Sequence, residues 1–357
     1  MEFLFKENIF QRTISNFPQT RYQGSKNKLL GWINENISFL DFETVLDAFG
    51  GTGAVSYLFK TIGKTITYND ILKSNYFIGT ALIENNHEIL SGSDLESSLS
   101  EKNLDYSDFI QKQFHQIYFT EAENKWLDIT IQNIYDEFHD NIYKKSLALW
   151  CLFQACIIKR PFNLFHRKNL YMRTNDVDRS FGNKTTWDKP FEYYFKKFSI
   201  EANQAIFDNG KKCKAIQLDA LKIPNHYDLV YIDTPYVSKK GVGVDYRHFY
   251  HFLEGLARYD EWDQLIDYKK KHLPLKSAYN PWCDKNSITD SFNALFSHFR
   301  KSHLVISYRS DGIPAVDNLI KMIKSYKKHC KLFVYKNYQY VLSTNNNSHE
   351  ILLIAWD

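Results

Sequence analysis

The chain has 357 residues and a mass of 42.3 kDa, which is enough for one large domain or two. Its 44% hydrophobic and 24% charged residues are typical of a globular protein that can bury a sizeable core. The net charge of +4 permits a nucleic-acid partner without requiring one.

Cysteine usage and apolar runs exclude further classes. The five cysteines are scattered and never form a Cys-x-x-Cys pair, so they indicate reduced thiols and exclude a disulfide framework or a zinc site. Residues 1–20 interleave charged and apolar side chains, so they contain no signal-peptide core. The longest apolar stretch, 147–158, is too short to span a bilayer. We therefore expect a cytoplasmic protein with no membrane contact.

In chain order, the first predicted elements form half of a nucleotide-binding unit. A helix is expected at 29–33, followed by a β-prone run at 44–49 that ends in glycines. A second helix at 54–60 and a second strand at 65–68 follow. This strand, glycine loop, helix and strand pattern predicts a doubly wound α/β sheet.

The middle of the chain has a different pattern. Residues 127–158 have helical periodicity and no strand alternation. Residues 159–189 read as a loop that carries eight basic and three acidic residues. We predict an inserted domain over 76–205, between the two parts of a catalytic domain, 1–75 and 206–357.

The α/β pattern resumes after the insertion. Further strands are predicted at 214–219, 229–233, 304–307, 332–335 and 351–355. Helices are predicted at 249–270 and 287–300 and from a start near Pro314, and a turn is predicted at 345–347.

The sequence Asp233-Thr234-Pro235-Tyr236 directly follows the apolar run that ends the 229–233 strand. A carboxylate, a proline and an aromatic ring after a buried strand form a rigid corner that can carry chemistry. An ordinary turn would also explain Asp and Pro at this point.

A glycine loop is the second candidate site. Glycine is scarce, yet three of the 14 glycines, Gly50, Gly51 and Gly53, fall within four positions. Missing side chains let a ligand approach the backbone, and the following helix amides can bind a carboxylate or phosphate, although a plain tight turn is also possible. Asp70, after the next strand, can accept both hydroxyls of a ribose. The third glycine of the dehydrogenase spacing is missing, which disfavours a dinucleotide and favours a smaller nucleoside ligand.

Three ordered motifs resemble one enzyme family. Asp47-Ala-Phe-Gly-Gly-Thr-Gly53 resembles the cofactor loop of S-adenosylmethionine-dependent methyltransferases. Asp233-Thr-Pro-Tyr236 resembles their Asp-Pro-Pro-Tyr signature for methylation of an exocyclic amine. Arg21-Tyr-x-Gly-Ser-Lys26 is similar to the opening motif of the Dam-like, D12 class of adenine-specific DNA methyltransferases. The tail segments Ser307-Tyr-Arg309 and Glu350-Ile-Leu-Leu-Ile354 also resemble this class.

The resemblance implies a Rossmann-like methyltransferase sheet, doubly wound, with a largely helical inserted DNA-recognition domain. It implies methyl transfer from S-adenosylmethionine to N6 of adenine in a specific sequence of double-stranded DNA, with S-adenosylhomocysteine as product and no metal. Asp233 and the carbonyl of Thr234 would accept the two amine hydrogens and so localise the nitrogen lone pair. Pro235 would stiffen the corner, and Tyr236 would stack on a base extruded from the duplex. Thr234 stands where the family usually has proline, but the proposed contact uses only its backbone.

The resemblance also assigns the cofactor contacts. They involve the opening motif, the glycine loop and several acids: Tyr22, Gly24, Ser25, Lys26, Asp47, Phe49, Gly50, Gly51, Gly53, Asp70, Asp219 and Asp233. Asp219 could instead cap a helix, Tyr22 could belong to the core, and Lys26 could be a solvated charge.

The basic loop is the predicted DNA-contacting segment, because Arg and Lys bind phosphates and Arg and Asn read base edges. Its predicted DNA contacts are Arg160, Arg167, Lys168, Arg173, Arg179, Asn183 and Lys184. A solvated surface loop is the alternative, and the segment 245–251 is a further candidate for contacting the extruded base or the phosphates.

The function expected is a monomeric or weakly dimeric enzyme of a restriction-modification or epigenetic system, with a partner methyltransferase or restriction endonuclease as possible associates. Alternatives are the same chemistry on RNA or protein glutamine, a non-catalytic DNA-binding subunit, and a dehydrogenase.

Overall fold

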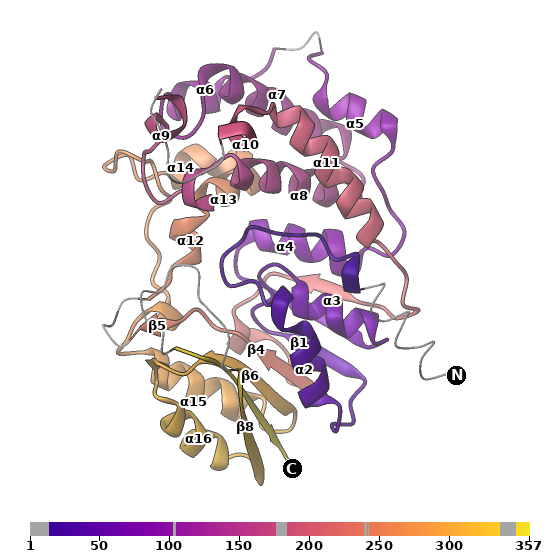
Figure 1. Ribbon diagram of the computed structural model, residues 1–357, viewed down its shortest axis with the longest axis vertical. Helices are drawn as coiled ribbons and strands as arrows, with labels where there is room; N and C mark the ends of the chain where they lie inside the picture. The colour runs from indigo at the N-terminus through magenta and orange to yellow at the C-terminus, as the bar shows by residue number, and fades with distance from the viewer. Residues whose placement is uncertain (1–13, 103–104, 176–183, 239–240, 242, 336–347) are drawn as a thin grey trace. The chain divides into compact units, whose positions relative to one another are not determined.

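A computed structural model describes residues 14–102, 105–175, 184–238, 241, 243–335 and 348–357. The chain folds as two compact units (Figure 1). The sheet unit consists of Gln23–Gly79, Asn209–Asp245 and Ala278–Asp357. The helical unit consists of Met1–Tyr22, Thr80–Asp208 and Tyr246–Ser277.

Seven strands form the main sheet of the sheet unit. They are β1 (Thr44–Asp47), β2 (Thr65–Asn69), β3 (Lys214–Ile216), β4 (Leu229–Ile232), β6 (His303–Arg309), β8 (His329–Tyr335) and β9 (Glu350–Trp356). Their order is β3-β2-β1-β4-β6-β9-β8, with β9 antiparallel to both neighbours and the other pairings parallel. The predicted Rossmann-like α/β fold is confirmed.

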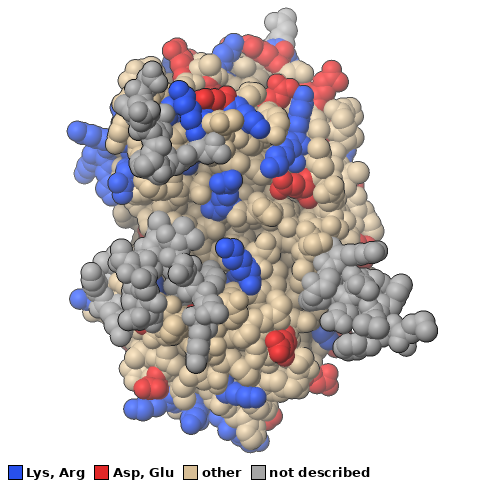
Figure 2. Space-filling view, viewed as in Figure 1, with Lys and Arg blue, Asp and Glu red and all other residues tan. Residues whose placement is uncertain are grey.

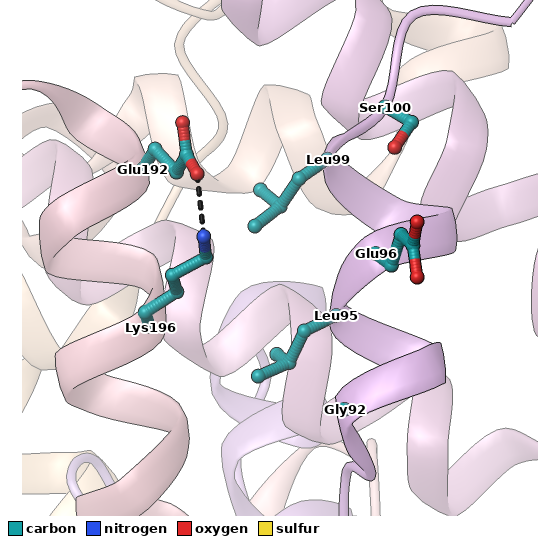
Figure 3. Close-up of a pocket in the computed structure, with 7 residues that line it drawn as sticks. All are labelled: Gly92, Leu95, Glu96, Leu99, Ser100, Glu192 and Lys196. Carbon is teal, nitrogen blue, oxygen red and sulfur yellow. Dashed lines mark hydrogen bonds and ion pairs between the residues drawn. The ribbon is translucent and has the colours of Figure 1, made fainter.

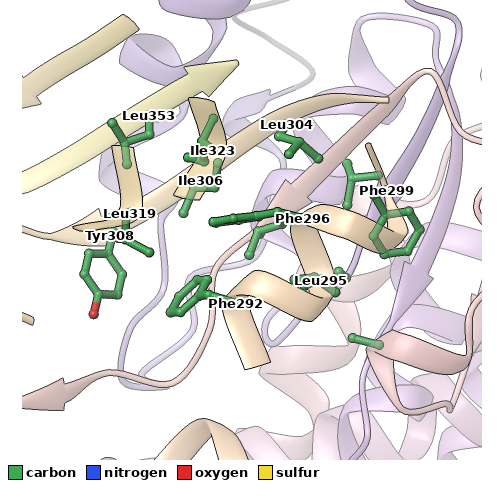
Figure 4. Close-up of a cluster of buried hydrophobic side chains, with 14 of the residues drawn as sticks. Phe292, Leu295, Phe296, Phe299, Leu304, Ile306, Tyr308, Leu319, Ile323 and Leu353 are labelled. Atoms are coloured by element: carbon green, nitrogen blue, oxygen red, sulfur yellow. The ribbon is translucent and has the colours of Figure 1, made fainter. Parts of the chain in front are cut away.

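Helices cover both faces of this sheet. On one face, α3 (Ala54–Thr61) places Phe59 against Tyr231 of β4, with ring centroids 6.3 Å apart. Side chains alternate along a strand, so the neighbours of Tyr231, Val230 and Ile232, point to the opposite face. There they join a buried cluster with α15 (Ile288–His298) and α16 (Val316–Lys324), shown in Figure 4.

The remaining elements of the sheet unit are short. They are η1 (Asn27–Leu29), α2 (Leu30–Ile37), α4 (Lys73–Gly79), η4 (Ala220–Lys222), η6 (Pro281–Cys283) and a two-stranded ribbon of β5 (Val237–Ser238) and β7 (Gly312–Ile313).

The strand order reverses between β1 and β4. From β1 the chain proceeds outward through β2 and β3, whereas β4 lies on the other side of β1. Asp47, the last residue of β1, pairs with Tyr231, so the loops that follow β1 and β4 leave the same edge side by side. Ligands of open α/β sheets bind at such a reversal, outside the carboxyl ends of the strands.

The helical unit contains α5 (Gly92–Leu99), α6 (Phe109–Gln113), α7 (Glu121–Glu137), α8 (Ile142–Ile158), α9 (Tyr171–Thr174), α10 (Lys184–Asp188), α11 (Phe191–Ala205), α12 (Tyr246–Phe249), α13 (His251–Ala257) and α14 (Trp262–Leu265). Its short turns are η2 (Thr80–Glu84), η3 (Pro161–Asn163) and η5 (Tyr259–Glu261). The apolar stretch 147–158 lies within α8 and is buried along its whole length. Within the described ranges, no helix is long and apolar enough to cross a membrane.

Several predicted boundaries differ from the structure. The helical pattern at 127–158 is divided between α7 and α8, because Phe138 ends the first helix and the Asn141 side chain accepts a hydrogen bond from Lys144 N at the start of the second. The helix predicted at 249–270 is broken into α13, η5 and α14. The turn predicted at 345–347 lies outside the described residues.

The predicted insertion, 76–205, lies almost wholly within the helical unit. That unit also includes Tyr246–Ser277, which the sequence placed with the sheet. The helix pattern of this segment is the same as that of the insertion, so periodicity alone could not assign it to a unit.

A hollow in the helical unit lies between α5 and α11 (Figure 3). Its lining combines leucines with an ion pair of 2.5 Å between Lys196 and Glu192. None of the residues predicted for the active site lines it.

Candidate active site

The glycine loop between β1 and α3 has the backbone geometry that glycine favours. Gly51 and Gly53 have φ of +51° and +78°, in the left-handed region, where a side chain would be strained. Gly50 lies against the ring of Tyr68, and a Cβ on it would come within 2.1 Å of a ring carbon. The Tyr68 hydroxyl donates a hydrogen bond of 2.7 Å to the Gly51 carbonyl. Tyr68, which the sequence did not single out, therefore packs against the loop and is hydrogen-bonded to it.

Asp70 holds the same loop from the neighbouring strand. Its Oδ2 accepts hydrogen bonds from Gly51 N at 3.0 Å and from Asn75 Nδ2 at 2.9 Å. Its Oδ1 accepts one from Leu72 N at 2.9 Å. The half-buried carboxylate is thus fixed at the edge where the sequence predicts a ribose-binding acid.

Asp47 is a buried acid at the end of β1. Its Oδ2 accepts a hydrogen bond of 2.7 Å from the Ser56 hydroxyl on α3. Its Oδ1 has no hydrogen-bond partner among the residues that the structure describes. Burial raises the pKa of Asp47 to about 7, and the charges of Asp233 and Asp70 add to the rise. Buried carboxylate oxygens are normally hydrogen-bonded or paired with a cation, so Asp47 Oδ1 can accept a donor or a cation from a ligand.

Lys26 of the opening motif is the centre of a buried charge cluster. Its Nζ lies 2.9 Å from both carboxylate oxygens of Asp233 and 2.7 Å from the Tyr236 hydroxyl. Glu350 Oε1 is 3.5 Å from the same Nζ and accepts a hydrogen bond of 2.6 Å from the Ser307 hydroxyl. Burial lowers the pKa of Lys26, but the charges of Asp233 and Glu350 outweigh it and hold the pKa well above its usual value. Lys26 is therefore charged and is not the solvated surface residue of the alternative interpretation.

Two oxygen acceptors at the corner after β4 are available for a ligand. Asp233 Oδ1 accepts hydrogen bonds from Lys26 and from the Tyr236 hydroxyl, the latter at 2.8 Å, whereas among the described residues only Lys26 contacts Oδ2. The backbone carbonyl of Thr234 accepts no hydrogen bond within the described part of the chain. The Asp233 side chain is 18% exposed, and a carboxylate oxygen has lone pairs for more than one donor.

Tyr236 is more buried than a simple stacking platform would be. It is 6% exposed, and its ring meets Tyr308 edge-on with centroids 5.8 Å apart. Its hydroxyl binds Asp233 and Lys26. Pro235, beside it, is partly exposed. In this structure the clearest effect of Tyr236 is to orient Asp233.

The other predicted cofactor residues are more dispersed. Gly24 has φ of +80°, and the Ser25 hydroxyl lies 3.5 Å from the Thr52 hydroxyl of the glycine loop. Phe49 packs edge-on against Trp282. Asp219 is exposed and accepts a hydrogen bond of 3.0 Å from Leu221 N, which is the helix-capping role of the alternative interpretation.

Tyr22 belongs to the helical unit. It is buried and stacks on Tyr250 of that unit, with ring centroids 4.0 Å apart, and more loosely on Tyr246. Burial favours the core role that was the alternative for Tyr22, and its cofactor contact stays a prediction.

The predicted DNA-contacting residues divide into buried and exposed groups. Arg160 is 1% exposed, and its guanidinium donates to the carbonyls of Tyr118 and Leu164 and to the Asn169 side chain. Arg173 is also buried and pairs with Glu123 at 2.6 Å. Burial and these internal partners favour a structural role for Arg160 and Arg173 over the predicted contact with DNA.

Arg167, Lys168 and Lys184 are exposed, as a phosphate contact requires. Arg179 and Asn183 lie outside the described residues. Figure 2 shows lysine and arginine side chains dispersed over the visible face, with no single continuous basic patch.

Two functional candidates were missed at the sequence level. Glu350 and Ser307 were noted only as parts of tail motifs, yet they complete the Lys26 cluster. The signal that could have found Glu350 is an acid at the start of an otherwise apolar strand, since buried acids are rare without a partner. No group of three or more His, Cys, Asp and Glu that could hold a metal ion occurs in the ranges that the structure describes.

Comparison with known proteins shows which family the chain matches. Residues 22–311 match the family model described as D12 class N6 adenine-specific DNA methyltransferase. The chain is 30% identical over 315 residues to the type II methyltransferase M2.HphI of Haemophilus parahaemolyticus, covering 86% of this chain and 88% of that protein. It is 24% identical over 322 residues to the type II methyltransferase M.NlaIII of Neisseria lactamica, covering 86% and 89%.

A longer relative matches over almost the whole chain. The modification methylase StsI of Streptococcus sanguinis is 26% identical over 358 residues, which cover 93% of this chain and 51% of that protein. The chain thus spans about half the length of this relative.

Proposed function

Because the chain belongs to the D12 class of N6 adenine-specific DNA methyltransferases, we propose that the adenine amine is held at the corner after β4. The observation that supports this proposal is the pair of available acceptors, Asp233 Oδ2 and the Thr234 carbonyl. An exocyclic amine has two hydrogens and a lone pair delocalised into the ring. Accepting one hydrogen at each oxygen draws the nitrogen towards a tetrahedral form, whose localised lone pair attacks the methyl group.

The family in general uses S-adenosylmethionine, and the residues present fit this cofactor. We propose that the unpartnered Asp47 Oδ1 binds the cationic methionine end, beside the glycine-loop backbone of Gly51 and Gly53. Asp70 would accept the ribose hydroxyls, and Asp219 would contact the adenine end. Bound at this edge, S-adenosylmethionine supplies the methyl group on its sulfonium and leaves as S-adenosylhomocysteine; we propose that no metal takes part.

Lys26 has a different role in this proposal from direct cofactor binding. Its ammonium is already shared by two carboxylates of the protein. We propose that Lys26 and Tyr236 orient Asp233, and that Pro235 limits the flexibility of the corner. The target adenine is proposed to leave the duplex, because its amine cannot otherwise reach a carboxylate at a sheet edge.

We propose that the helical unit carries target recognition on double-stranded DNA. The exposed Arg167, Lys168 and Lys184 are suited to phosphate contacts, which position a protein on DNA. The names of the relatives, modification methylase and type II methyltransferase, favour a restriction-modification role. The proposed setting is the cytoplasm of a prokaryote, as a monomer or weak dimer, with a restriction endonuclease or second methyltransferase as a possible associate.

Labelled-donor transfer tests this function against its alternatives. The protein is incubated with S-adenosylmethionine labelled in its methyl group and with mixed-sequence duplex DNA, RNA or protein. The product is then digested to nucleosides or amino acids. Label in N6-methyladenine from DNA supports the proposal, whereas label only in RNA or glutamine supports the alternative substrates. Cofactor binding without transfer to any DNA would contradict it and favour a non-catalytic subunit.

A further inference from the structure

We propose that Glu350 is a positioning residue for methyl transfer, which shares the Lys26 ammonium with Asp233 and thereby keeps Asp233 a strong acceptor for the target amine. This inference rests on the role proposed above for Asp233. The cluster of Lys26, Asp233 and Glu350 is built from three segments: the opening loop, the end of β4 and the start of β9.

Glu350 is a second buried acid beside the ion pair of Lys26 and Asp233. Glu350 is fully buried at the first position of β9, and Ser307 Oγ fixes its Oε1 at 2.6 Å. Oε1 lies 3.5 Å from Lys26 Nζ and 3.4 Å from the Tyr236 hydroxyl. The Lys26 ammonium therefore lies between two carboxylates, closer to Asp233 than to Glu350.

A functional explanation follows from the division of the ammonium. If Lys26 paired with Asp233 alone, its full charge would weaken the carboxylate as a hydrogen-bond acceptor. Glu350 draws part of this interaction to itself. Burial raises the pKa of Asp233, Lys26 lowers it, and Glu350 raises it again, in agreement with this division. Among the residues that the structure describes, the charged and titratable groups that face Asp233 are Lys26, Tyr236, Glu350, Tyr231 and Asp47.

Two substitutions separate the charge of Glu350 from its shape. Glu350→Gln keeps the size and the acceptor for Ser307 but removes the charge, whereas Glu350→Asp keeps the charge and loses one methylene. The pH profiles of kcat, and the KM for cofactor and for DNA, are measured for both variants from about pH 5 to about pH 9. Glu43→Gln is the control, because Glu43 is exposed on the same unit and its carboxylate pairs with Lys64 and Lys211.

For Glu350→Gln we expect kcat to fall about tenfold, both KM values to stay within about twofold, and the acid limb to move about one pH unit lower. The lower limb follows because the carboxylate of Asp233 then loses its proton at lower pH. Glu350→Asp should lie closer to wild type in both respects. Unchanged kcat in Glu350→Gln, or a fall in kcat with an unmoved acid limb, would overturn the proposal.

The experiment remains decisive if Glu350→Gln does not fold, as judged by loss of cofactor binding. Glu350→Asp then carries the test: near-wild-type kcat and acid limb support the charge role, and a large loss of kcat with an unmoved limb refutes it. Asp233→Asn is measured alongside. Retained turnover in Asp233→Asn would contradict the proposed role of Asp233 itself. If Asp233→Asn is inactive, the role of Asp233 stands, and the Glu350 variants then test the role of Glu350 alone.

Discussion

The Lys26 ammonium lies 2.9 Å from both carboxylate oxygens of Asp233, across 207 positions of sequence. The opening motif and the corner after β4 are therefore parts of one buried charge cluster. This contact explains why a lysine near the start of the chain belongs to the same site as an acid in its second half.

Replacing Lys26 should destabilise the protein. Lys26→Met leaves Asp233 and Glu350 buried without their cation, and breaking a buried pair in this way costs about 3–5 kcal/mol. The loss should be larger at high pH: without Lys26 the pKa of Asp233 rises further above its unfolded value, so stability falls as pH rises through that pKa. Urea unfolding at several pH values measures it.

The control for Lys26→Met is Lys211→Met, which removes a pair with Glu43 that is exposed on both sides. Its cost should be at most about 1 kcal/mol. Adding Glu350→Gln to Lys26→Met should recover part of the lost stability by removing one unpaired carboxylate. Equal stability losses in Lys26→Met and Lys211→Met would refute the buried cluster.

The glycine loop gives a steric prediction. Gly50→Ala places a methyl group 2.1 Å from a carbon of the Tyr68 ring, which is held on its other side by Gly79. We expect a loss of about 1–3 kcal/mol in unfolding free energy and much weaker cofactor binding. Gly31→Ala is the control, since a Cβ there meets nothing within 4 Å and helix α2 should gain slightly. Cofactor affinity that is unaltered in Gly50→Ala would contradict the loop's proposed role.

The raised pKa of Asp47 predicts pH-dependent cofactor binding. Because this pKa is about 7, the carboxylate form that binds a cation prevails only above neutral pH. The Kd for S-adenosylmethionine should therefore increase about tenfold from pH 8 to pH 6, with proton release on binding near pH 7. Isothermal titration calorimetry in buffers of different ionisation enthalpy measures both effects.

Asp47→Asn is the matched variant for that measurement. It should bind the cofactor more weakly at pH 8 and show a flat pH dependence. A wild-type slope in Asp47→Asn would assign the pH dependence to another group.

Exposed and buried basic residues of the helical unit should have different effects when they are replaced: the exposed ones should affect DNA binding and the buried ones stability. Combined Arg167→Ala, Lys168→Ala and Lys184→Ala substitutions should weaken DNA binding and reduce its salt dependence while the fold stays intact. Arg160→Ala should instead destabilise the helical unit, because the Arg160 guanidinium donates to three buried residues, Tyr118, Leu164 and Asn169. Salt titrations of DNA affinity and thermal unfolding distinguish the two. Normal DNA affinity in the triple variant would place recognition elsewhere.

Much of the fold could be predicted from the sequence because its signals are local. The β-prone runs that became β1, β2 and β4 are short apolar segments ended by Gly or Asp, and these chemical features determine both the strand and the loop after it. The approach of Gly50 to Tyr68 was not predictable, since Gly50 lies in the loop after β1, Tyr68 lies in β2, and their packing has no periodic signal.

The burial of charged side chains in the insertion could not be predicted from the sequence. Arg160, Arg167 and Arg173 lie in the same basic segment, yet Arg160 and Arg173 are buried against carbonyls and Glu123, whereas Arg167 is exposed. Burial of a charged side chain depends on partners far away in sequence. For the same reason the role of Glu350, whose partners include Lys26, could be found only in three dimensions.

The central claim is that Asp233 holds the reacting amine. Asp233→Ala leaves Lys26 beside Glu350, so the buried cluster stays charge-balanced and the variant should fold. The direct measurement is single-turnover methyl transfer to duplex DNA by Asp233→Ala, together with its affinities for cofactor and DNA. We predict unchanged affinities and a rate lower by about 10²–10³-fold. A rate equal to wild type would contradict the claim.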